Sequence, residues 1–183
     1  MLRWGINLFG AIFSVLVLAI GVWYAASFLP HLGELNKIAA RGQESTRQVK
    51  NTIYPLAIAS ESKQGIRTYA LRQAYYFLVY QQNRSTMTSW HLNNALWYLA
   101  SLVHFSEDEV FAIWAECVLA DCKNGLVDAA KKYFEADLNN LSEHDLAALV
   151  VLVKSPSRYA PGSERSEQRI NELHKKVITQ KSE

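Results

Sequence analysis

The sequence predicts an all-α protein that begins with a single apolar helix. Residues 8–29 contain no charged side chain. Beyond them, apolar residues recur at spacings of three and four, which is typical of amphipathic helices. The alternation of apolar and polar residues between turn pairs that marks β-hairpins does not occur in the sequence. Helices packed on helices are therefore the predicted architecture.

The N-terminal apolar run is long enough to span a bilayer, because about 20 helical residues at 1.5 Å each cross a ~30 Å hydrocarbon core. Trp4 stands near one end, and Trp23 and Tyr24 near the other, where amphipathic rings suit the interface. Pro30 is expected to stop the helix. A cleaved signal peptide is an alternative, with residues 25–27 as a weak cleavage site, although such peptides have apolar stretches of only about 7–15 residues. A buried core helix fits less well, because the run is apolar all round.

The rest of the chain divides into a polar juxtamembrane helix or linker, a helical domain and a short charged tail. The expected boundaries are 1–30 for the anchor, 31–52 for the linker, 53–178 for the domain and 179–183 for the tail. Helices are predicted over residues 66–81, 85–105, 106–123, 126–134, 142–155 and 163–178.

Helix ends carry recognisable signals. Ser85 is a candidate N-cap, and Ser106 with Glu109 forms a capping-box pattern. Ser142 with Asp145 starts a further helix, and Asn124, followed by a glycine, breaks one.

Charge and cysteine content exclude some classes of function. The net charge of +2 is too small to indicate a nucleic-acid partner. Cys117 and Cys122 match no zinc pattern. They are either two ordinary thiols or, in an oxidising compartment, a local disulfide, which would require the helix to end between them. His91 and His104 are too far apart to form a metal pair on one helix and are expected to be core or surface histidines.

Several motifs, taken in order, resemble family 51 of the glycosyltransferases, the peptidoglycan polymerases. Five segments resemble motifs of the family, in the family's order. They are residues 59–63 (Ala-Ser-Glu-Asp-Lys/Arg in the family), 85–88 (Ser-Thr-Ile-Thr), 106–110 (Ser-Lys-Asp-Glu-Ile), 129–134 (Ala-Ala-x-x-Tyr-Phe) and 156–161 (Pro-Ser-Arg-Tyr-x-Pro). The resemblance covers about residues 53–175. It implies a lysozyme-like helical transglycosylase domain.

The resemblance also implies a set of site residues. Glu61 occupies the position of the family's catalytic base. The candidate substrate-binding residues are Lys63, Arg67, Arg84, Ser85, Thr86, Thr88 and Arg158. In the family's reaction a sugar hydroxyl attacks an anomeric carbon and a lipid pyrophosphate leaves. That reaction needs a base and cationic or amide groups for the leaving group, often with a divalent cation. No cofactor is certain from the sequence.

The sequence departs from the family pattern in its catalytic half. Ser62 stands where the family has Asp, and Asn83 and Arg84 replace two glycines. The segment that should contain Arg-Lys-x-x-Glu, with the second catalytic carboxylate, is missing. Glu107 and its acidic neighbours are explained by helix capping. Losing one of two catalytic groups commonly lowers the rate by several powers of ten, so enzymatic activity is left open.

Three functions remain. The first is an accessory protein of peptidoglycan synthesis that binds a lipid-linked disaccharide or glycan strand with weak or lost polymerase activity. The second is an active minimal polymerase, and the third is a structural subunit with cell-envelope protein partners. Basic residues follow the apolar run as well as precede it, so their count does not favour a cytoplasmic N-terminus. The short N-terminal tail and the resemblance together predict a single-pass protein of the inner (cytoplasmic) membrane with its domain on the outer side.

Overall fold

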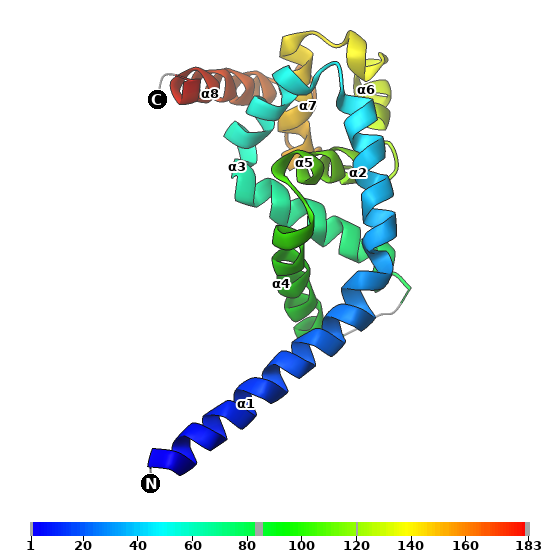
Figure 1. Ribbon diagram of the computed structural model, residues 1–183. Coiled ribbons are helices and arrows are strands. Elements are labelled where there is room, and N and C mark those ends of the chain that lie inside the picture. The colour runs from blue at the N-terminus through cyan, green and yellow to red at the C-terminus, as the bar shows by residue number, and fades with distance from the viewer. Residues whose placement is uncertain (1, 83–85, 120, 182–183) are drawn as a thin grey trace.

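The computed structural model describes residues 2–82, 86–119 and 121–181. Within these residues every regular element is helical and no strand occurs, which confirms the predicted class (Figure 1). The α-helices are α1 (Leu2–Trp23), α2 (Leu32–Thr46), α3 (Lys50–Tyr75), α4 (Met87–His104), α5 (Glu107–Cys117), α6 (Gly125–Phe134), α7 (Glu143–Lys154) and α8 (Glu164–Lys181). Short π or 3₁₀ segments are η1 (Tyr24–Phe28), η2 (Leu29–His31), η3 (Tyr76–Tyr80) and η4 (Leu138–Asn140).

The N-terminal helix does not stop at Pro30, contrary to the sequence-based expectation. The chain passes from α1 through η1 and η2 directly into α2, with Pro30 in the first turn of η2. Proline is tolerated there because the first N–H groups of a helix have no partner within the helix. The apolar run and α2 thus form one helical path.

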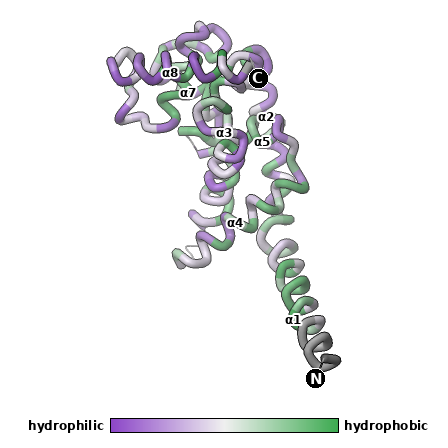
Figure 2. Tube along the Cα trace, turned by 90° about the vertical axis from the view of Figure 1, so that its left-hand side faces the viewer, coloured by the Kyte–Doolittle hydropathy of each residue, from purple (hydrophilic) through white to green (hydrophobic). Residues whose placement is uncertain are grey.

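From residue 10 onward α1 is mostly apolar and extends away from the other helices (Figure 2), and its large apolar side chains from Ile12 to Val22 are exposed. Val15, Leu18 and Val22 are each more than 60% exposed. Within the described residues, the helical run Gly10–Thr46 holds the one window long and apolar enough to cross a membrane, although a signal sequence passes the same test.

The core forms where α2 and α3 pack against α5. Phe111, Ile113 and Trp114 of α5 are buried. The segment expected to be a juxtamembrane helix or linker contains α2, which buries Leu35 and Ile38 in this core.

A second packed layer is made by α7 and α8. Residues 146–153 of α7 are buried, and α8 packs through Ile170 and Leu173. Both views place α7 and α8 at the opposite end of the molecule from the free end of α1 (Figures 1 and 2).

Two of the three helix caps predicted from sequence are confirmed. Ser106 and Glu109 form a reciprocal capping box, and the Ser142 side chain accepts a hydrogen bond from the N–H of Asp145. Helix α4, however, is capped by Thr86. The expected cap, Ser85, lies outside the described residues.

The two cysteines form a disulfide. Helix α5 ends at Cys117, as the disulfide alternative required, and the chain then turns back through left-handed conformations that include Cys122 and Asn124. Arg41 of α2 donates a hydrogen bond to the carbonyl of Cys122, which ties this loop to the core.

Candidate functional site

The helix α3 is broken at Ser62, directly after the candidate base. Ser62 has φ 64° and ψ 160°, a conformation adopted almost only by glycine, so it costs about 1–3 kcal/mol. Its hydroxyl accepts a hydrogen bond from the N–H of Gly65 and caps the second half of the helix. Strain of this kind clusters at functional sites, and the kink is therefore the natural centre of a candidate site.

Glu61 is paired at this kink with a residue that sequence reasoning did not single out. Its Oε1 lies 3.3 Å from Nζ of Lys154, the last residue of α7, and its side chain is 28% exposed. Lys154 Nζ also donates to the carbonyl of Ser60 at 3.5 Å. The candidate base thus faces a cation of its own chain and is not in open solvent.

A cavity of about 210 Å³ lies beside the second half of α3, where α3, α4 and α5 meet. This volume falls below the range of about 300–1,000 Å³ usual for small-molecule sites. Its polar and aromatic lining residues are Tyr54, Lys63, Gln64, Arg67, Tyr98 and Glu107.

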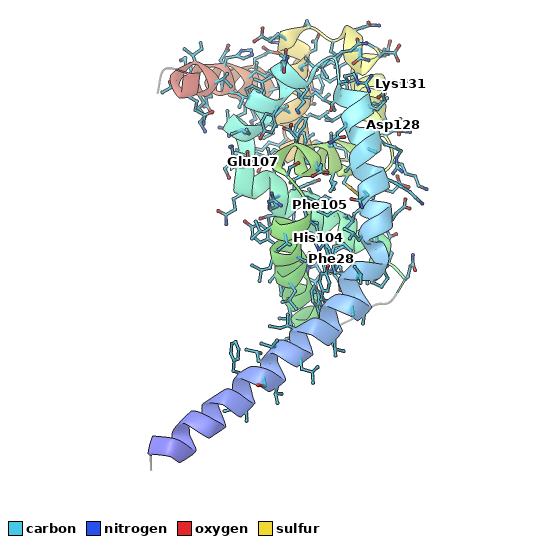
Figure 3. The ribbon with its side chains drawn as sticks, viewed as in Figure 1. Phe28, His104, Phe105, Glu107, Asp128 and Lys131 are labelled. Carbon is cyan, nitrogen blue, oxygen red and sulfur yellow. A yellow bond between two sulfur atoms is a disulfide. The ribbon has the colours of Figure 1, made fainter. Side chains whose placement is uncertain are left out.

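Lys63 lines this cavity and pairs with Glu107, which Figure 3 labels, and both side chains are exposed. Its Nζ lies 2.6 Å from Glu107 Oε2, and the hydroxyl of Tyr54 donates to the same oxygen at 3.3 Å. The hydrogen bond from Lys63 lowers the pKa of Glu107, and the reciprocal contact raises the pKa of Lys63. Burial, followed by the charge of Glu107, raises the pKa of Tyr54. Glu107 therefore neutralises one of the predicted substrate-binding cations.

Arg67 is engaged by the C-terminus of α4. Its guanidinium donates to the carbonyl and the hydroxyl of Ser101 at 2.9 and 3.2 Å, and to the carbonyl of Phe105 at 3.2 and 3.3 Å. The carbonyl of Ser101 also accepts a hydrogen bond from the N–H of Phe105, and carbonyls at the C-terminal end of a helix carry partial negative charge. This arrangement gives Arg67 a structural role at the cavity wall.

The predicted donor-site residues lie far from this cavity. Thr86 and Thr88 stand at the N-terminal end of α4, whereas Arg67 contacts its C-terminal end. A helix of 18 residues is about 27 Å long. Arg84 and Ser85 lie outside the described residues.

Arg158 lies in the turn that follows α7, away from both the cavity and the N-terminal end of α4. Its guanidinium lies 5.6 Å from the ring centroid of Tyr159, and it lines a separate groove with residues of α8. The structure thus keeps Glu61, Lys63 and Arg67 around the kink, and it separates them from Thr86 and Thr88 and from Arg158.

Sequence reasoning missed Lys154 and Tyr54, and it assigned Glu107 to helix capping alone. Capping accounts for Glu109, but the contacts of Glu107 run across to α3. Nothing local in the sequence pairs Tyr54 or Lys63 with a residue at the start of α5, because these contacts depend on how α3 bends.

Comparison with known families supports the resemblance seen in the motifs. A family model described as transglycosylase matches residues 45–181, which is most of the chain. No curated protein and no solved structure matches the chain. The match includes the kink, the cavity and the turn after α7. The chain belongs to the transglycosylase family, the family 51 glycosyltransferases.

Proposed function

We propose that this protein is a membrane-anchored accessory member of the transglycosylase family, which binds a peptidoglycan precursor or glycan strand without polymerising it. One observation carries the proposal: the candidate catalytic groups are paired with other groups of the same domain. Glu61 pairs with Lys154, Lys63 with Glu107, and Arg67 with the end of α4.

Polymerisation makes demands that these pairings oppose. A general base must reach the acceptor hydroxyl, and cationic groups must meet the leaving pyrophosphate. Glu61 would have to leave Lys154 to accept a proton, and Lys63 would have to leave Glu107 to bind a phosphate. Thr86 and Thr88, at the far end of α4, cannot contact the same bound group.

Membrane anchoring and an outward-facing domain belong to the same proposal. The exposed apolar surface of α1 favours a lipid environment. Trp23, at the end of α1, donates a hydrogen bond to Asn93 of α4, next to the exposed Leu92. The disulfide between Cys117 and Cys122 favours an oxidising compartment, outside the cytoplasm.

An active minimal glycosyltransferase is the second candidate. Glu61 beside the strained Ser62 favours it, because strain is commonly retained where a backbone must present a reacting group. A divalent cation bound with the pyrophosphate would supply the missing positive charge.

A structural role in an envelope complex is the third candidate. It is favoured by the exposed apolar residues of α4, which include Met87, Leu92, Leu99 and Val103.

The test is a polymerisation and binding assay on the full chain in detergent. Lipid-linked disaccharide is added with Mg²⁺ or with a chelator to the native protein, to Glu61→Gln and to Glu44→Gln. Glu44 pairs with Arg47 on the surface of α2 and is the matched control. We expect precursor binding without polymer in all three proteins.

The other outcomes each select another function. Polymer from the native protein and Glu44→Gln, but not from Glu61→Gln, would establish the minimal enzyme. If the native protein shows no binding and no polymer, the structural role remains as the candidate function.

A further inference from the structure

A second concave surface, separate from the kink in α3, lies between the turn after α7 and the first half of α8. It has a volume of about 250 Å³ and is lined by Arg158, Tyr159, Arg165, Gln168, Arg169 and Glu172. We call it the arginine groove. Except for the ring of Tyr159, its lining side chains are polar or charged, so it suits a charged ligand.

The arginine groove has more positive than negative charge. Arg169 is paired with Glu172 at 2.7 Å. Arg158 lies over the ring of Tyr159, and within the described residues neither Arg158 nor Arg165 has a carboxylate at ion-pair distance. Guanidinium groups that converge without counter-charges repel one another, and a bound anion relieves this repulsion. Arginine also presents paired N–H donors that match the two oxygens of a carboxylate or phosphate.

The groove is held in shape before any ligand binds. The N–H groups of Arg158 and Tyr159 both donate to the carbonyl of Ser155, which closes the turn after α7. Ser166 and Ile170 are buried on the opposite side of α8 and hold that helix against its neighbours. The backbone positions from which Arg158 and Arg165 extend are therefore set by two packed elements.

The position of the groove selects between two sources of anions. The helix α8 and the end of α7 lie at the opposite end of the molecule from the free end of α1 (Figures 1 and 2). If α1 is embedded in a bilayer, phospholipid headgroups of that bilayer lie near α1 and α4, and α8 lies at the end of the molecule far from them (Figure 1). An anionic polymer that extends away from the membrane reaches the groove.

We propose that the arginine groove binds carboxylate groups carried by a peptidoglycan strand, at a site separate from the kink in α3. This inference rests on the proposed binding function and adds the part of the ligand that is recognised. Arg158 and Arg165 supply the free donors, and Arg169 stays tied to Glu172 and borders the site.

The experiment measures binding of the full chain, in detergent, to soluble uncrosslinked peptidoglycan strands and to vesicles that contain an anionic phospholipid. The test protein is the double variant Arg158→Gln, Arg165→Gln. The control is Lys175→Gln, Lys176→Gln, which removes the same charge from exposed positions further along α8. Circular dichroism and melting temperature establish that both variants fold.

We expect the arginine variant to bind strands about tenfold more weakly for each guanidinium removed, and the lysine variant to bind as the native protein does. An equal loss in both variants would show unspecific charge attraction and overturn the proposal. A loss confined to the vesicles would assign the groove to lipid and overturn it as well. Polymerisation is read in a separate assay, so an active polymerase would overturn the accessory role while the strand-binding result stands on its own.

Discussion

Lys63 Nζ lies 2.6 Å from Glu107 Oε2, which joins the segment after the kink in α3 to the first turn of α5. The pKa of Glu107 is lowered from 4.5, so its contribution to stability is present above pH 4.5 and is lost as the pH falls through the lowered pKa. The pKa of Lys63 is raised from 10.5, so its contribution is present below pH 10.5 and is lost as the pH rises through the raised pKa. We expect Glu107→Gln to reduce the dependence of stability on pH at both the acidic and the alkaline end of the range.

Thermal unfolding from below pH 4.5 to above pH 10.5 measures this change. Glu143→Gln, on an exposed position in the first turn of α7, is the control and should keep the native profile. Identical profiles for the native protein and Glu107→Gln would show that the pair does not form in solution.

Replacing Ser62 tests the strain at the kink. Ser62→Gly should raise the free energy of unfolding by about 1 kcal/mol, because glycine adopts this conformation without strain and costs only a few tenths as a cap. Ser62→Ala keeps the strain and removes the cap for Gly65, so it should lower the stability by about 1 kcal/mol. Urea unfolding of the three proteins gives the order, and equal stabilities would contradict a strained kink.

Arg67→Met should destabilise the fold by about 2–3 kcal/mol, because it removes the guanidinium donor of the Phe105 carbonyl and a charge-assisted hydrogen bond to Ser101. Arg67→Lys should also be destabilising, since an ammonium cannot reach Ser101 and Phe105 with the same fork. Arg72→Met, which removes a cation that lies over the ring of Tyr69, is the milder control. If denaturant unfolding shows that Arg67→Met is as stable as the native protein, Arg67 has no structural role and is again a candidate for ligand binding.

Gly42 marks the closest approach of α2 to α5. A Cβ at this position would overlap the backbone carbonyl of Ala112, so Gly42→Ala should cost about 3 kcal/mol. Gly33→Ala, in the same helix, meets nothing within 4 Å and should stabilise by about 0.5–1 kcal/mol. Melting temperatures that move in the same direction for both variants would rule out this packing of α2.

The disulfide gives a prediction about compartment as well as stability. Alkylation of the native protein without reductant, followed by mass spectrometry, should label neither Cys117 nor Cys122, and labelling after reduction is the positive control. Replacing both residues with serine should cost about 2 kcal/mol in denaturant unfolding, as expected for a short loop. Free thiols in protein isolated directly from cells would contradict an oxidising location.

Sequence patterns predicted the features that depend on neighbouring residues. The capping box at Ser106 and the cap at Ser142 each depend on residues no more than three positions apart. The helix after Ser106, predicted to run to the break at Asn124, ends instead at Cys117. The apolar spacing of α2 was also visible at Leu35 and Ile38, but its partner, α5, lies far along the chain and could not be read from it.

The candidate site was harder to predict because its contacts are long-range. Glu61 was found through a motif, whereas Lys154 reaches it only because α7 ends beside the kink. The unusual backbone of Ser62 follows from this tertiary setting, since serine has no intrinsic preference for it. Leu92 and Val103 share one face of α4 by their helical spacing, yet the structure leaves that face uncovered.

The helical path from α1 through η1 and η2 into α2 leaves no flexible linker between the apolar helix and the domain. A flexible tether would let a domain tumble freely above its attachment point. Here α2 is packed against α5 at Gly42, and Trp23 at the end of α1 is hydrogen-bonded to Asn93 of α4, so the end of α1 has a defined place on the domain. If α1 lies in a membrane, the tilt of α1 therefore determines how the domain, including the arginine groove, is oriented relative to the bilayer surface.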